Sequence, residues 1–247
     1  MSDAATMATR CLRLSLRQVD ALMTSLILPV MLMLMFVYLF GGAIQTGGEY
    51  VTYVVPGVIL LCAGFGSATT AVSVSHDMAG AIIDRLRSMD VSGPAVVGGH
   101  VTASIARNAA STTLVLVVAL LIGFRPHAGA LDWLAVVGIL LAFVLAISWL
   151  SAAIGLLVKS PETANAVAFI FMFLPYASSA FVPIDTMPSW LQGFAHHQPV
   201  TPVIETLRGL LLDTPVDSNP TTALAWCSAI LLGSIALSGL LFAHRTR

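Results

Sequence analysis

Six segments of about twenty mostly apolar residues recur along this 247-residue chain, and they constrain its fold more than any other feature. A helix needs about 20 apolar residues to cross a bilayer, and as a helix it satisfies its own backbone hydrogen bonds within lipid. We therefore expect an all-α, polytopic membrane protein that forms one transmembrane domain over residues 1–247. The predicted spans are residues 26–44, 54–75, 105–124, 133–158, 163–182 and 221–243.

The charge content agrees with a lipid environment, since only 9% of the residues are charged, against about 25% in soluble domains. This content excludes a water-soluble globule and a disordered chain, and it gives no basic surface for nucleic acid. The sole lysine is Lys159, which Ser160 follows as in a phosphate-binding P-loop. Ala153 and Val158 occupy the two positions that such a loop fills with glycine, so this sequence holds no ATPase site of that kind.

The basic residues predict the orientation, because an even number of spans places both termini on one side. Only Arg125 and Arg208 fall on the opposite side. The positive-inside rule therefore predicts that both termini are cytoplasmic. The nine basic residues on the terminal side are Arg10, Arg13, Arg17, Arg85, Arg87, Arg107, Lys159, Arg245 and Arg247. We expect Arg107, near one end of its span, to extend towards the headgroups.

The N-terminal segment 9–25 predicts an amphipathic helix in the cytoplasmic interface. Arg10, Arg13 and Arg17 recur at helical spacing, and the apolar residues Leu12, Leu16, Val19 and Met23 fall on a different face. A basic flank that only sets the topology is an equally good interpretation.

Residues 76–104 form a long predicted cytoplasmic loop with a short helix at Met78–Met89. Such a helix could dock in a groove of a partner or rest on the membrane. Its apolar stripe is made of Ile82, Ile83, Leu86 and Met89, while Asp84, Arg85, Arg87 and Asp90 lie elsewhere on it or just beyond.

The outer stretch 183–220 holds six of the twelve prolines and two short amphipathic pieces that we expect to dip into the outer leaflet or cap a cavity. The first piece, Ser189–Phe194, carries Trp190 and Leu191. The second is predicted to begin with Thr201 as its N-cap and Pro202 at the first helical position. Further along it, Glu205 and Arg208 stand three residues apart and can pair.

Three blocks of residues make the chain similar to a known family. These blocks are Tyr50–Gly57; then Asp77, Arg85–Arg87, Val91 and Ser92; and finally Phe181–Pro183, Met187, Pro188, Trp190, Leu191, Pro199–Pro202, Glu205, Arg208 and Gly209. With them the chain resembles the permease subunits of type-2 ABC exporters, in particular the bacterial group of daunorubicin-resistance permeases. The pair His196 and His197 departs from the family pattern.

The resemblance implies a permease in a bacterial plasma membrane that exports a hydrophobic or amphipathic drug, lipid or glycoconjugate. It implies a dimer, with an identical copy or a paralogue, and a separate ABC ATPase subunit that binds ATP and Mg²⁺, so that this chain itself needs no cofactor. The implied ATPase-coupling residues are Asp77, Ile82, Ile83, Arg85, Leu86 and Arg87, supported by the interfacial Arg10, Arg13 and Arg17. The implied outer gate comprises Pro183, Pro188, Trp190, Leu191, Pro199, Thr201, Pro202, Glu205 and Arg208.

Two other classes compete with this interpretation. A secondary multidrug or lipid transporter is disfavoured by spans without central charges and by the lack of an obvious internal repeat. A membrane-embedded enzyme needs a nucleophile and a base at membrane depth, whereas we expect every histidine in a loop or terminal segment. Adjacent histidines on a helix diverge by about 100°, so we do not expect a metal site. The polar run Ser67, Thr69, Thr70, Ser73 and Ser75, like Asn165, could line a path or only allow close packing.

Overall fold

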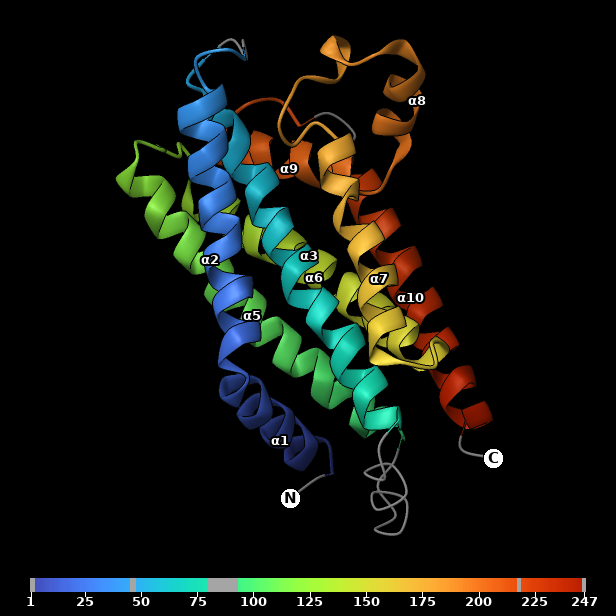
Figure 1. The fold of residues 1–247 in the computed structure, drawn as a ribbon. Coiled ribbons are helices and arrows are strands. Elements are labelled where there is room, and N and C mark those ends of the chain that lie inside the picture. Colours follow the sequence, from blue (N-terminus) through green and yellow to red (C-terminus); the bar gives the residue numbers. More distant parts are fainter. Residues whose placement is uncertain (1–2, 45–47, 80–92, 217–218, 246–247) are drawn as a thin grey trace.

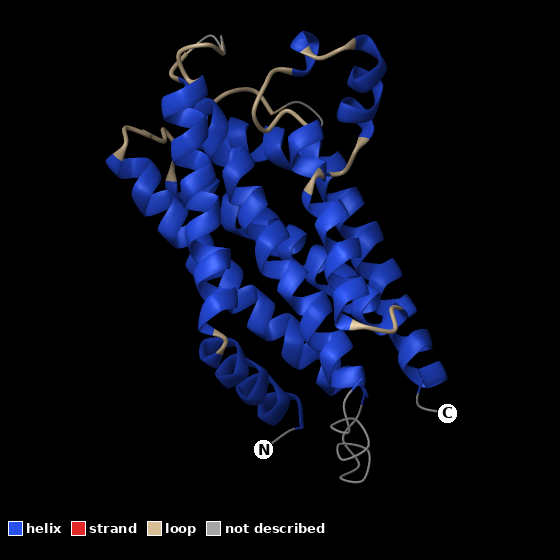
Figure 2. Cartoon of the chain, viewed as in Figure 1, coloured by secondary structure: helices blue, strands red, loops and turns tan. Residues whose placement is uncertain are grey.

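The computed structural model describes residues 3–44, 48–79, 93–216 and 219–245, and the regular structure in these ranges is helical throughout (Figures 1 and 2). The expected all-α class is therefore confirmed. The elements in chain order are α1 (Asp3–Arg17), α2 (Val19–Met35) with a π-helical extension (Phe36–Phe40), α3 (Tyr50–Ala79), α5 (Gly93–Leu121), α6 (Ala130–Leu157), α7 (Pro161–Met172), the 3₁₀ turns η2 (Leu174–Ala177) and η3 (Ile184–Thr186), α8 (Ser189–His197), α9 (Val200–Leu212) and α10 (Asn219–Arg245).

Among the described residues, five helices are long and apolar enough to cross a membrane. They are Val19–Phe40, Tyr50–Ala79, Ala95–Leu121, Ala130–Leu157 and Asn219–Phe242. In α3, 78% of the most apolar stretch is buried, against 17% for the first and last of these helices. The α3 helix is therefore the centre of the bundle, and it contacts α2, α5, α6, α7 and α9.

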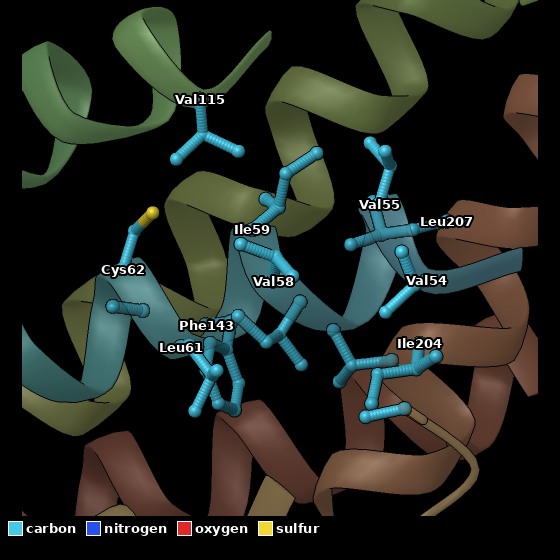
Figure 3. Close-up of a cluster of buried hydrophobic side chains, with 14 of the residues drawn as sticks. Val54, Val55, Val58, Ile59, Leu61, Cys62, Val115, Phe143, Ile204 and Leu207 are labelled. Carbon is cyan, nitrogen blue, oxygen red and sulfur yellow. The ribbon is translucent and has the colours of Figure 1, made fainter. Parts of the chain in front are cut away.

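The core lies around the first half of α3, where α5, α6 and α9 converge (Figure 3). Val58 and Ile59 of α3 are buried, as are Phe143 of α6 and Leu207 of α9. Gly57 allows the segment between η2 and η3 to approach α3 closely, since a Cβ at Gly57 would lie 2.6 Å from the Cβ of Ala180. The short α9 helix thus fills the outer end of the bundle with apolar side chains, as expected for a segment too short to span.

One predicted span, residues 163–182, is not a continuous helix. The α7 helix ends at Met172 and is followed by the 3₁₀ turn η2, after which Ser178 is extended. Pro175 explains the break, because proline has no N–H to donate and its ring disfavours helical geometry at the residue before it. In Figure 1, α7 nevertheless runs from the end of α6 towards the opposite end of the bundle.

The boundaries on the N-terminal side of the bundle also differ from the prediction. The segment 9–25 is not one helix, because α1 ends at Arg17 and α2 begins at Val19, with the backbone of Gln18 (φ −85°, ψ 69°) between them. The predicted loop 76–104 is shorter, since α3 continues to Ala79 and α5 already begins at Gly93. The predicted helix 78–89 therefore starts within α3, and the rest of it lies outside the described residues.

Candidate functional site

A charged cluster joins α1, α3 and α5 at the end of the bundle where the chain begins. Arg10 Nη1 donates a hydrogen bond of 3.0 Å to Asp77 Oδ2, and His100 Nε2 lies 3.0 Å from the same oxygen. Asp77 and His100 are buried, whereas Arg10 is partly exposed. Partial burial opposes the charged form of Arg10, but the hydrogen bond and the charge of Asp77 outweigh it and raise the pKa of the guanidinium. The cluster holds α1 against α3 and α5.

A second buried cation, Arg107, lies deeper on the same side of α5. Its guanidinium donates to Ser15 Oγ at 2.9 Å, to the carbonyl oxygen of Gly66 at 3.1 Å and to Thr70 Oγ1 at 2.9 Å. The expectation that Arg107 extends to the headgroups is wrong, because α1 packs along α5 and supplies an acceptor within the protein. The expectation that every histidine lies outside the long helices is also wrong, since His100 belongs to α5.

Arg10 is the only one of the three predicted interfacial arginines that turns inwards in this way. Arg13 and Arg17 are exposed. The buried face of α1 consists of Met7, Cys11 and Ser15, which are spaced four residues apart. The predicted apolar stripe lies elsewhere, and Leu16 and Val19 on it are 68% and 57% exposed.

A groove of about 710 Å³ lies between α2, α3 and α7. Thr69 and Ser73 of α3 and Asn165 of α7 line it. The other members of the polar run, Ser67, Thr70 and Ser75, are buried in the protein instead. One part of the run therefore faces an open groove, and the other part lies between packed helices.

At the outer end, Arg208 of α9 connects three segments. It donates to Glu205 Oε1 at 2.6 Å, to the carbonyl oxygen of Ser179 at 2.7 Å and to that of Tyr53 at 3.2 Å. The guanidinium also lies 3.8 Å from the centroid of the Tyr53 ring, in cation–π geometry. The predicted pairing of Glu205 with Arg208 is confirmed. A hydrogen bond of 3.0 Å from Tyr50 Oη to the carbonyl oxygen of Phe181 adds a second link.

The remaining outer-gate residues fall into two groups. Pro183, Glu205 and Arg208 line an open cavity of about 630 Å³. Of the others, two are exposed: Pro188, and Trp190 in α8, which is 78% exposed. Four are partly or fully buried, namely Leu191, Pro199, Thr201 and Pro202. Thr201 is not the N-cap of its helix, because α9 already begins at Val200 and the Thr201 hydroxyl donates to the carbonyl oxygen of Ala195 at 2.6 Å.

The other predicted coupling residues, Ile82, Ile83, Arg85, Leu86 and Arg87, lie outside the described residues. Within the described ranges, no three His, Cys, Asp or Glu side chains are placed to hold a metal ion. The structure therefore brings together the first and third sequence blocks at the outer end, and it joins Asp77 of the second block to α1 and α5.

Comparison with known proteins identifies the chain. Residues 3–212 match the ABC-2 type transporter family. The chain belongs to this family. It is 29% identical over 190 residues to the daunorubicin resistance ABC transporter permease protein DrrB1 of Streptomyces coeruleorubidus, covering 76% of this chain and 67% of the relative. It is also 26% identical over 214 residues to the probable doxorubicin resistance ABC transporter permease protein DrrC of Mycobacterium tuberculosis, covering 83% of this chain and 75% of the relative.

This ABC-2 permease is thus a transmembrane subunit of an ABC exporter and a multi-pass plasma membrane protein. The ATPase activity of such a transporter resides on a separate ABC subunit with which the permease works. The resemblance drawn from the three sequence blocks is confirmed. Sequence reasoning missed the roles of His100 and Arg107, although the polar residues of α5 carry a signal. His100, Ser104, Arg107, Asn108 and Ser111 follow helical spacing and form one polar stripe in an otherwise apolar helix.

Proposed function

We propose that two copies of this permease, or this permease and a paralogue, form the membrane-spanning part of an exporter for hydrophobic or amphipathic compounds such as drugs, lipids or glycoconjugates. The match to the ABC-2 family over residues 3–212 carries this proposal. The two relatives are named for resistance to daunorubicin and doxorubicin, which supports an apolar, aromatic substrate. The groove between α2, α3 and α7 supports a substrate path along this face, where a second copy would close it.

The proposed topology has six crossings and places both termini in the cytoplasm. The beginning of α1 and the end of α10 lie at the same end of the bundle (Figure 1), which supports an even number of passes. We assign the sixth pass to α7 together with η2, residues 161–177. The excess of basic residues at this end supports the orientation.

The proposed ATPase contact includes the exposed side of α1, at the same end of the bundle. Ile82, Ile83, Arg85, Leu86 and Arg87 remain the proposed contact residues. The contacts of Asp77 support a different role for this residue, because Arg10 and His100 already occupy its buried carboxylate. We propose that Asp77 holds α1 against α3, so that a displacement of α1 by the ATPase also moves α3.

Arg208 is the central residue of the proposed outer gate. This side chain connects α9 to the start of α3 and to the turn at Ser179. A movement of α3 that starts at Asp77 would therefore reach α9 through Tyr53 and Arg208. Opening of the cavity of about 630 Å³ at this end would then accompany movement of α3.

A transport assay tests the proposal. The permease is co-expressed with its partner ABC ATPase, and inside-out membrane vesicles are incubated with doxorubicin, whose fluorescence reports accumulation in the vesicles. We expect accumulation that requires ATP, the ATPase and the permease together, and we expect the ATPase to co-purify with the permease. Transport by the purified permease alone in vesicles without ATP would overturn the proposal, and a catalytically dead ATPase serves as the matched control.

A further inference from the structure

A small polar cavity of about 180 Å³ lies between α1, α3 and α5, next to the charged cluster. Its walls carry two guanidinium groups, Arg10 and Arg107, but a single carboxylate, that of Asp77. Two positive charges against one negative leave the cavity with a net positive charge before the two histidines on its walls, His76 and His100, are counted. The volume is room for about six water molecules, which is enough for a phosphate group.

Arg107 is the source of the excess positive charge in the cavity. Its side chain is buried, and in the described part of the chain no carboxylate lies within ion-pair distance of it. Its three hydrogen-bond acceptors are neutral, and its Nε has no partner. A buried cation without a counter-ion is costly, and in membrane proteins such residues pair with an anion or mark a binding site. Arg10 does not share this property, because Asp77 neutralises it.

The cavity adjoins the groove between α2, α3 and α7. Gln18, Ser73 and His76 line both spaces, and Gln18 and His76 are exposed at the rim. Beyond this rim, the walls of the groove include apolar side chains, among them Phe65 of α3 and Phe169 of α7, against which an apolar chain can lie. A ligand that fills both spaces must carry an anionic group at one end and an apolar chain at the other.

Two carboxylates, Asp20 and Glu162, also line the groove but not the small cavity. Their negative charge makes the groove unfavourable for an anion, so that the anionic group fits only against Arg107. The phosphate of a phospholipid combines this charge with acyl chains, and the unpartnered Nε–H of Arg107 can donate a charge-assisted hydrogen bond to it. We propose that this permease binds an anionic phospholipid with the phosphate in the cavity at Arg107 and an acyl chain in the groove.

Native mass spectrometry of the full-length permease in a neutral detergent tests the proposal with three probes. Phosphatidylglycerol carries phosphate and chains, diacylglycerol carries the chains alone, and inorganic phosphate carries the anion alone. We expect a retained phosphatidylglycerol adduct, no retained diacylglycerol, and no displacement of the lipid by millimolar inorganic phosphate. Equal retention of diacylglycerol would overturn the anion site, and displacement by inorganic phosphate would overturn the lipid as its occupant.

Variants test whether Arg107 itself binds phosphatidylglycerol. In Arg107→Gln the phosphatidylglycerol adduct should fall by about tenfold or more, the effect of losing one charge-assisted hydrogen bond, while Arg107→Lys should retain most of it. The matched control is Arg125→Gln, which removes an exposed arginine that bonds only to the nearby carbonyl oxygens of Leu120 and Phe124. An unchanged adduct in Arg107→Gln would overturn the proposal.

A further variant keeps the test decisive if Arg107→Gln does not fold, as judged by its helical circular dichroism. Ser73→Leu leaves Arg107 intact and narrows the passage between the cavity and the groove. A folded Ser73→Leu permease that loses the phosphatidylglycerol adduct supports the proposal, and one that retains it at the wild-type level overturns the two-part site.

Discussion

Replacing Asp77 with asparagine tests whether the charged cluster fastens α1 to the bundle. The change keeps the size of the side chain but removes the negative charge that Arg10 and His100 both face at 3.0 Å. Removing one partner of a fully buried ion pair costs about 3–5 kcal/mol. Because the side chain of Arg10 is 26% exposed, water screens part of this interaction, and we expect about 2–3 kcal/mol for the release of α1.

Hydrogen–deuterium exchange measures this release directly, because local opening exposes the amides of α1 without unfolding the rest. A loss of about 2–3 kcal/mol corresponds to about 30- to 150-fold faster exchange in α1. The amides in the middle of α6 should exchange as in the wild type, since α6 is held by apolar contacts with α3 and α10. Asp185→Asn is the matched control, because it makes the same change at an exposed position at the other end of the bundle.

Equal exchange of α1 in the wild type and in Asp77→Asn would refute the reasoning. It would mean that the apolar contacts of Met7 and Cys11, with the hydrogen bond from Arg107 to Ser15, suffice to hold α1 in place. Acceleration spread evenly over α1, α3 and α6 would also refute it, since the variant would then have lowered the stability of the whole protein instead of releasing one helix.

Three further predictions concern the outer end, the core and the ATPase contact. Arg208→Met should lower the thermal midpoint by an amount that corresponds to about 2–3 kcal/mol, because the charged hydrogen bonds to two backbone carbonyl oxygens are lost; an unchanged midpoint would contradict the role of this residue. Gly57→Ala should cost about 1–3 kcal/mol of stability by overpacking, whereas Gly138→Ala, whose Cβ would meet nothing within 4 Å, should be neutral or slightly stabilising in the same melting assay. Charge reversal at Arg85 and Arg87 together should separate ATP hydrolysis from doxorubicin transport at normal expression, and undiminished transport would remove both from the proposed contact.

The sequence predicts the apolar helices well because the requirement for about 20 apolar residues is local and leaves a strong signal. The prediction fails at the fifth span because hydropathy measures only how apolar a segment is. Residues 163–182 are mostly apolar, but Pro175 interrupts the helix, and α7 ends at Met172. The Glu205–Arg208 pair is predictable because both residues lie on one turn of a single helix.

The contacts between distant segments could not be derived from spacing. Arg208 finds its acceptors at Tyr53 and Ser179, which are 155 and 29 residues away, and only the packing of α9 against α3 brings them together. The same holds for Asp77 and Arg10, which are 67 residues apart. The family resemblance indicates which blocks matter, but it does not show that two of them touch or that Asp77 faces inwards.

The polar stripe on α5 gives α1 a structural role beyond that of a flank that sets topology. A helix that carries His100 and Arg107 is unfavourable in lipid unless another element covers these side chains. The α1 helix supplies that cover, since Arg10 completes the contacts of Asp77 with His100 and Ser15 accepts a hydrogen bond from Arg107. Arg107 bonds in turn to Gly66 and Thr70 in the middle of α3. Any displacement of α1 must therefore either carry α3 with it or leave buried charges without partners, and a buried charge without its partner is strongly destabilising.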